Sequence, residues 1–156
     1  MSSLALSRHG GLLSGLSAPA AGASAQAVTR ITVSALAGLK SGLGAGSSLV
    51  FNDLQMLAKE CDTEVRENQV FSLAQRFLLA LPAYLPAPEL AFDSDGEISF
   101  DWMGSVGRLL TVTLREDGRL SYAARISVYD KDHGIKQFVD SIPTHVLDLV
   151  QQVTGV

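Results

Sequence analysis

Four side chains in the C-terminal part of the chain have types that could do chemistry: Asp130, Asp132, His133 and His145. Carboxylates and imidazoles bind divalent metals, and they also act as general acids and bases. One functional hypothesis is therefore a small hydrolase or metal-dependent enzyme that uses the Asp130–His133 loop. A metal site would need three or four of these side chains to converge from a loop and a helix, and the spacing does not enforce this.

No nucleophile motif accompanies this loop. The chain has no G-x-S-x-G elbow and no paired cysteine and histidine motif. Cys61, the only cysteine, follows apolar residues at helical spacing, which indicates a packing residue. A single thiol cannot form an intramolecular disulfide, which is typical of a reducing compartment. We expect no metal ion and no cofactor, and the favoured hypothesis is a protein that is not an enzyme.

The acidic residues of the turn DSDG (residues 93–96) match a calcium-binding loop only in part. That loop has its first ligand five residues before the glycine and a closing glutamate six residues after it. Ala91 and Trp102 occupy those two places. The segment therefore predicts a tight β-turn, since Asp and Gly tolerate the left-handed backbone of such turns.

The composition of the 156-residue chain divides it into two parts. Residues 1–52 hold no acidic residue and three basic ones, whereas residues 53–156 hold all 16 acidic residues and the other nine basic ones. Phosphate contacts need clustered lysines and arginines, and the basic residues of the second part are scattered. We therefore expect the folded domain to bind no nucleic acid.

The segment 1–47 is rich in Ala, Ser, Gly and Leu and buries too little to offset its ordering entropy, so we predict disorder. A targeting segment and an element docked on the domain remain alternatives. A membrane helix over residues 31–51 would contain Lys40, four glycines and five hydroxyl residues, which argues against it. We expect no membrane association and a cytoplasmic protein, with secretion through a weak N-terminal signal as the alternative.

Residues 48–156 are predicted to form one domain that begins with two helices. Asn52 or Asp53 would cap the first helix. The second has the clearest period in the sequence: from Val70 to Leu81, apolar residues recur at i, i+3, i+4, i+7, i+8 and i+11. Pro82 ends it, because the residue before a proline avoids the helical region.

From Glu89 onward the apolar period changes to two, which indicates strands. Short turns separate four of them, and the stretch 120–128 is the last. A polar loop over residues 129–134 follows, and residues 135–140 fit either a short strand or a helical turn. Ser141 is predicted to cap a last helix, with Pro143 in its first turn. The predicted fold class is α+β, a four-stranded antiparallel meander packed on one face by two or three helices.

The alternation places polar side chains on the face of the sheet that no helix covers. An open sheet face is the best candidate for a partner site, and the partner is expected to be another protein. The candidate partner-binding residues are Asp101, Thr111, Thr113 and Arg125. Trp102 lies in phase with Ile98 and Phe100, so we expect it in the core, with an exposed anchor as the alternative.

The stretch from Val70 to Trp102 resembles a group of small uncharacterised bacterial proteins. They share a helix running into Leu-Pro, a proline-bounded strand, then Asp-Gly and a tryptophan that closes the next strand. The corresponding segments here are FLLALP (77–82), PAPEL (86–90) and DGEISFDW (95–102).

A later Asp-Gly turn and a closing helix of that group resemble EDGRLSYA (116–123) and SIPTHVLDLV (141–150). The group usually has a Trp-Asp-Gly-x-Gly-Ala turn, of which residues 61–66 keep only the aspartate. The resemblance implies the fold and a bacterial origin but no activity. Together with the composition it favours a non-enzymatic protein–protein interaction module or accessory protein.

Overall fold

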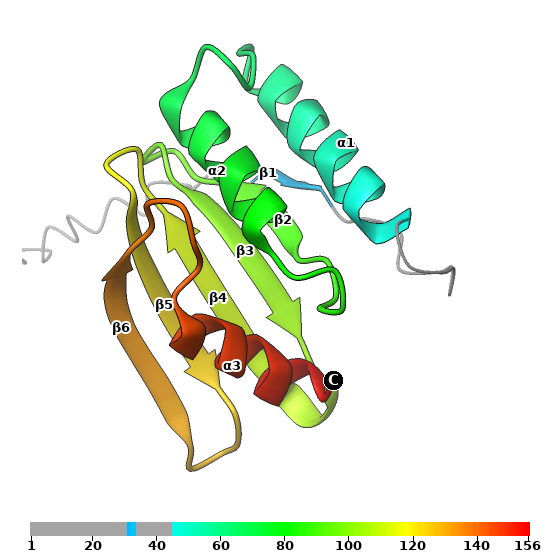
Figure 1. Cartoon of the computed structure of the whole chain (residues 1–156), viewed down its shortest axis with the longest axis vertical. Helices are drawn as coiled ribbons and strands as arrows, with labels where there is room; N and C mark the ends of the chain where they lie inside the picture. The colour runs from blue at the N-terminus through cyan, green and yellow to red at the C-terminus, as the bar shows by residue number, and fades with distance from the viewer. Residues whose placement is uncertain (1–30, 34–44) are drawn as a thin grey trace, which may run out of the picture.

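The computed structural model describes residues 31–33 and 45–156. It confirms the α+β class and the antiparallel meander, and its sheet has six strands, in the order β1-β2-β3-β4-β5-β6, where four were predicted (Figure 1). In chain order the elements are β1 (Ile31–Val33), α1 (Ala45–Glu60), α2 (Gln69–Ala80), β2 (Glu89–Phe92), β3 (Ile98–Met103), the 3₁₀ turn η1 (Ser105–Gly107), β4 (Leu109–Leu114), β5 (Arg119–Arg125), β6 (Lys131–Gln137) and α3 (Thr144–Thr154).

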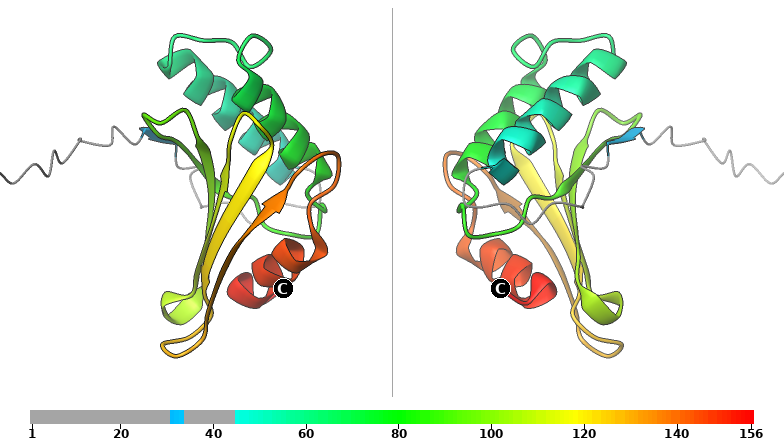
Figure 2. Two further views of the ribbon diagram at one scale, coloured as in Figure 1. Left: turned by 90° about the vertical axis from the view of Figure 1, so that its left-hand side faces the viewer. Right: turned by 90° about the vertical axis from the view of Figure 1, so that its right-hand side faces the viewer.

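In the part of the chain that the structure describes, the three α-helices lie on one face of the sheet and none covers the other face, which is called the open face (Figure 2). α1 contacts β1, β2 and α2, whereas α2 contacts β3 and β4. α3 crosses β3, β4 and β5 at the other end of the same face. This is the layer arrangement predicted from the alternation, since β4 and β5 bury every second residue on the helix side.

Aromatic side chains fill the space between α2 and the sheet. The ring of Phe77 stacks on Phe100 with centroids 4.4 Å apart, and Phe138 meets Phe77 edge-on at 5.4 Å. Trp102 is 2% exposed, and its indole Nε1 donates to the carbonyl oxygen of Pro86 at 2.8 Å. Trp102 therefore fills the core, as predicted, and is not an exposed anchor.

The first helix begins earlier than predicted. α1 starts at Ala45, so the predicted cap at Asn52 or Asp53 is wrong and both residues lie inside the helix. The reason is that its apolar face continues backward to Val50, which is buried. Of the segment predicted to be disordered, residues 1–30 and 34–44 lie outside the described residues. Ile31–Val33, also within it, is a strand paired with β2.

The predicted loop over residues 129–134 is also wrong, because most of it belongs to β6. Of the residues 135–140, predicted as a short strand or a helical turn, 135–137 are the end of β6, as the strand alternative has it. Sequence periodicity misses the first part of β6 since this edge strand has almost no apolar residue to bury. Gly134 has a specific role within it. A Cβ added at Gly134 would lie 2.6 Å from the hydroxyl oxygen of Tyr122, so only glycine fits beneath that ring.

The chain leaves β5 and enters α3 differently from the prediction. β5 ends at Arg125, and the N–H of Ile126 bonds the carbonyl oxygen of Asp130 to close the turn. α3 begins at Thr144, so the predicted cap at Ser141 is wrong. Pro143 occupies the cap position without a side-chain bond, and its carbonyl oxygen accepts the first N–H groups of the helix.

Candidate functional site

The structure brings together two of the four candidate catalytic or metal-binding side chains. Asp132 and His133 are neighbours in β6 and therefore lie on opposite faces of the sheet. His145 Nε2 lies 2.6 Å from Asp132 Oδ2 on the helix face, whereas His133 pairs with Ala123 on the open face. Asp130 lies in the preceding turn. Within residues 31–33 and 45–156, no three His, Cys, Asp or Glu side chains are grouped to hold a metal ion.

Tyr122 joins the contact between Asp132 and His145. Its ring meets the imidazole edge-on, with centroids 5.5 Å apart. Burial, and then the nearby charge of Asp132, raise the pKa of the Tyr122 hydroxyl above its usual value. The phenol therefore stays protonated at neutral pH, and the three side chains fasten the first turn of α3 to β5 and β6.

Cys61 has the environment of a packing residue. Its side chain is partly buried at the end of α1 against the hydrophobic core. Burial, with a smaller contribution from the charge of Glu60, raises the pKa of the thiol above its usual value. The thiolate is the reactive form, so this environment makes Cys61 a poor nucleophile at neutral pH.

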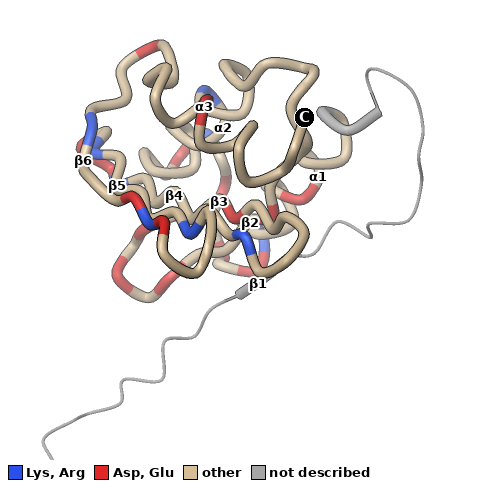
Figure 3. Tube along the Cα trace, turned by 90° about the horizontal axis from the view of Figure 1, so that it is seen from below, with Lys and Arg blue, Asp and Glu red and all other residues tan. Residues whose placement is uncertain are grey.

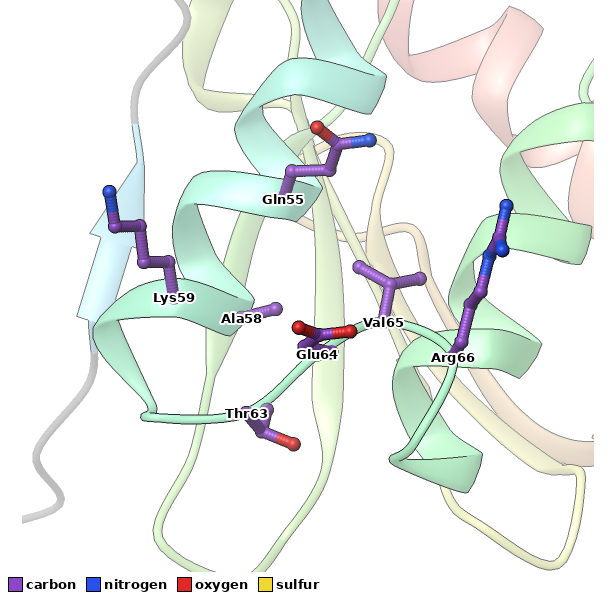
Figure 4. A pocket seen from close by; sticks show the side chains of 7 residues that line it. All are labelled: Gln55, Ala58, Lys59, Thr63, Glu64, Val65 and Arg66. Atoms are coloured by element: carbon purple, nitrogen blue, oxygen red, sulfur yellow. The ribbon is translucent and has the colours of Figure 1, made fainter.

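A hollow of about 490 Å³ lies where the end of α1 meets the α1–α2 loop (Figure 4). It is lined by Gln55, Ala58, Lys59, Thr63, Glu64, Val65 and Arg66. Lys59 and Arg66 lie on opposite sides of the hollow and extend away from each other (Figure 4). Because the two cations do not converge on one point, we assign no chemistry to this hollow.

The four predicted partner-binding residues lie on the open face of the sheet, where the alternation places them. Thr111 Oγ1 donates to Asp101 Oδ1 at 2.5 Å, across the β3–β4 pair. Thr113 is half-buried between its neighbours on β3 and β5. Arg125 is exposed, at the end of β5. Three of the four are therefore partly enclosed by the sheet itself, and Arg125 is the most accessible.

The β3–β4 and β5–β6 loops lie at one end of the sheet, at the bottom of Figure 1, and present large apolar side chains to solvent. We call these residues the loop end: Met103, Val106, Val128 and Tyr129. Their exposed fractions are 68%, 99%, 78% and 98%. Isolated exposed apolar residues are ordinary, but three on two neighbouring loops, with Met103 at the adjoining end of β3, mark a candidate contact surface.

Sequence reasoning missed the loop end for two reasons. Val106 and Tyr129 stand in turns, which carry no periodic signal. Val128 continues the alternation of the predicted strand 120–128, which places it on the apolar face, whereas β5 ends at Arg125. A signal is nevertheless present in the composition of the two turns. Val106 stands between Ser105 and Gly107, and Val128 and Tyr129 stand between Ser127 and Asp130. Apolar residues are unusual in turns that glycine, serine and aspartate otherwise build.

The β3–β4 loop is held in place from two sides. Arg108 donates from Nη1 to the carbonyl oxygen of Gln152 in α3 at 2.8 Å, and from Nη2 to Ser105 Oγ at 2.8 Å. Gly104 lies so close to α3 that an added Cβ would clash with the carbonyl oxygen of Val153. The loop is therefore fixed to the helix layer, although it presents Val106 to solvent.

The β5–β6 loop has its own internal bonds. Ser127 Oγ accepts the N–H groups of Tyr129 at 3.2 Å and Asp130 at 3.0 Å. Arg125 Nε donates to the carbonyl oxygen of Gly107 at 2.7 Å and thereby joins the end of β5, where this loop begins, to the β3–β4 loop. The two loops thus form one unit.

Val106 has a left-handed backbone, with φ 58° and ψ 38°. For a β-branched residue this conformation is unfavourable, by about 1–3 kcal/mol. The side chain regains nothing from burial, because it is almost fully exposed. Strain of this kind on an exposed loop is typical of functional sites.

Two cations border the apolar side chains of the loop end. Met103, Leu109, Arg125 and Lys131 form one row across β3, β4, β5 and β6 on the open face. Arg125 and Lys131 also line a hollow of about 340 Å³ with Val106, Gly107, Ser127 and Val128. The hollow thus combines apolar walls with the positive charges of Arg125 and Lys131. Elsewhere along the sheet, acidic and basic residues are interspersed, as Figure 3 shows from below.

No family model matches this chain, and neither a curated protein nor a solved structure matches it significantly. The resemblance to small bacterial proteins therefore stays a prediction. Among the described elements, no helix combines the length and apolar character that crossing a membrane requires.

Proposed function

We propose that this domain is a non-enzymatic protein-binding module that contacts its partner through the loop end and the adjoining open face of the sheet. The observation that carries the proposal is the group of four exposed apolar side chains, three on the two loops and Met103 at the end of β3, beside the bond from Arg125 to Gly107. A bacterial accessory role and a cytoplasmic location, both expected from the sequence, are part of the same proposal.

A surface that is already ordered binds a partner at a lower entropic cost. Binding is opposed by the entropy lost when loops and side chains become fixed, so a surface held rigid before binding loses less. Both loops are fixed by hydrogen bonds to α3, to β5 and within themselves. Tyr129 is also the kind of residue that dominates binding energy in protein interfaces.

The charges around the loop end define the partner chemistry. Arg125 uses Nε to hold Gly107, which leaves its other guanidinium N–H groups to donate. Lys131 adds a second cation on the same row. A carboxylate beside an aliphatic or aromatic side chain satisfies both the cations and the apolar walls, so the partner is expected to present an acidic, apolar peptide segment.

The test is selection from a random peptide library displayed on phage, with the full chain immobilised. We expect enriched peptides to carry Asp, Glu or a terminal carboxylate within two residues of a large apolar side chain. Synthetic copies of the enriched peptides should bind in titration calorimetry. The double variant Val106→Asp with Val128→Asp should weaken that binding by about tenfold or more, because each new carboxylate repels the acidic peptide and would have to be desolvated in the complex.

The control variant is Tyr84→Asp, which also places a charge on an exposed apolar residue but outside the loop end; Tyr84 is 61% exposed. It should leave the peptide affinity unchanged. Enriched peptides that bind the double variant as tightly as the original chain would disprove the proposed surface. A cooperative melting transition in each of the three proteins establishes that the comparison concerns binding rather than folding.

A further inference from the structure

β6 is an edge strand with an unusually open outer side. It is hydrogen-bonded to β5 and, among the described residues, to no strand on its other side. It is seven residues long, whereas the opposite edge strand, β1, has three. A long exposed edge offers a row of free N–H and C=O groups to another strand, which proteins normally block or use.

The sequence of β6, KDHGIKQ, is complementary to itself when read in reverse. Two copies related by a two-fold axis can pair antiparallel only in registers centred on one residue, since the outward-facing groups alternate along the strand. Centring on Gly134 places Asp132 opposite Lys136 of the second copy, and the symmetry repeats that pair. Lys131 then faces Gln137, and no like charges meet.

Neighbouring registers lose this charge match. With His133 at the centre, Asp132 faces Gly134 and the two His133 side chains face each other. With Ile135 at the centre, Asp132 faces the buried Phe138. Directly opposed charges of opposite sign stabilise a strand pair, so the register centred on Gly134 is the favoured one.

We infer that two copies of this chain associate through β6, antiparallel and centred on Gly134, to form one continuous sheet. This inference is independent of the proposed function at the loop end. Asp132 has an oxygen to spare, because His145 Nε2 contacts Oδ2 and leaves Oδ1 for Lys136 of the second copy. Lys136 itself is exposed and makes no ion pair with any residue that the structure describes.

The open face gains apolar contact from the same register. Ile135 is 65% exposed in the single chain, so its apolar surface is accessible to a second copy. In the pair it lies opposite His133 of the second copy and diagonally across from the second Ile135, within reach of both. Gly134 adds no side chain at the two-fold axis, so the strands can approach closely there.

The experiment is sedimentation velocity of the full chain over a range of concentrations, at low and at high salt. We expect a dimer that dissociates on dilution. Its dissociation constant should be larger in high salt, because salt screens the two exposed ion pairs. Lys136→Glu places like charges opposite each other twice and should raise the dissociation constant by about tenfold or more. Lys131→Glu, a matched charge reversal opposite Gln137, should leave the dimer unchanged.

Mixing two variants tests the register. The Lys136→Glu chain and an Asp132→Lys chain should each stay monomeric, but their mixture pairs Asp132 with Lys136 and Glu with Lys, so a heterodimer should form. A melting curve of each variant shows whether it is folded. A wild-type chain that is monomeric at every concentration would overturn the inference, and so would a dimer that Lys136→Glu leaves intact. Neither result bears on peptide binding at the loop end.

Discussion

Arg125 of β5 donates a hydrogen bond from Nε to the carbonyl oxygen of Gly107, 2.7 Å away, and this bond joins the two loops of the loop end. A guanidinium stays charged at every physiological pH and has five N–H donors. Arg125 can therefore hold the β3–β4 loop and still present a positive charge to a partner. Predicted from the sequence as a binding residue, it is also the residue that orders the surface.

Replacing Arg125 by alanine should weaken peptide binding strongly while it lowers the stability of the fold only slightly. We expect a loss of about 1 kcal/mol in the free energy of unfolding, the value of an ordinary hydrogen bond, because the side chain is exposed. Affinity for selected peptides should fall by about tenfold. Urea unfolding measures the first and titration calorimetry the second. An unchanged affinity would show that Arg125 contributes neither order nor charge to binding.

Val106→Gly should stabilise the protein and weaken binding. Glycine adopts a φ of 58° without strain, so we expect a gain of about 0.5–1.5 kcal/mol, reduced by the greater flexibility of glycine in the unfolded chain. Val128→Gly is the matched control, since Val128 is also exposed but has no positive φ. Urea midpoints compare the two, and equal effects would mean that the backbone of Val106 is not strained.

Truncation of the aromatic core should be severe. Phe77→Ala, Phe100→Ala and Trp102→Ala are each expected to lower the free energy of unfolding by about 3–5 kcal/mol, because all three side chains are buried. Domains of this size have only about 5–15 kcal/mol to lose. Leu79→Ala on the same α2 helix is the control, since Leu79 is 68% exposed and should cost less than about 0.5 kcal/mol. A wild-type melting curve for Trp102→Ala would contradict the observed burial.

The fold was predictable from the sequence where burial of one side of an element produces a regular spacing of apolar residues. The stripe of α2 and the alternation of β3, β4 and β5 follow from one apolar side per element, and the structure has these elements close to their predicted places. β6 was not predictable in this way, because an edge strand on an open face buries little. Its strand conformation depends on pairing with β5 and on the packing of Gly134 beneath Tyr122. Both are tertiary contacts, which a local sequence pattern does not encode.

For the candidate site, the sequence predicted only which face of the sheet the strand residues lie on. Strand alternation assigned Thr111 and Thr113 to the open face correctly, since side-chain direction follows from residue parity alone. It could not indicate that Val106 and Tyr129, 23 positions apart in the sequence, belong to loops at the same end of the sheet. That proximity depends on strand lengths and order.

Changes on the open face and at His133 should have opposite outcomes. Thr111→Arg or Thr113→Arg adds bulk beside Asp101 on the proposed contact surface and should reduce peptide affinity without unfolding the domain. His133→Ala, although on the same face, removes an exposed side chain and should change stability by less than about 0.5 kcal/mol. Calorimetry and thermal melting test both. Binding that survives both threonine changes but fails with His133→Ala would move the contact surface to β6.

Asp53 should give the domain a distinctive pH dependence. Its side chain is 9% exposed inside α1, and burial raises the pKa of its carboxyl group above the usual value. Between the usual and the raised pKa, the folded chain therefore binds more protons than the unfolded chain. Stability consequently falls as the pH rises through this interval, and above it the unfavourable burial of a carboxylate remains in full.

Asp53→Asn removes the charge with little change in shape, so the variant should melt at a higher temperature than the original chain at pH 7. The difference should shrink as the pH is lowered toward the usual pKa of aspartate, because the original carboxyl group then becomes neutral in both states. Leu79→Ala, at an exposed position without an ionisable group, is the control and should show no such trend. Thermal melts of the three proteins from pH 3 to pH 8 measure it. A difference in melting temperature that stays constant with pH would contradict the raised pKa of Asp53, because only a pKa that differs between the folded and unfolded chains makes the effect of the substitution depend on pH.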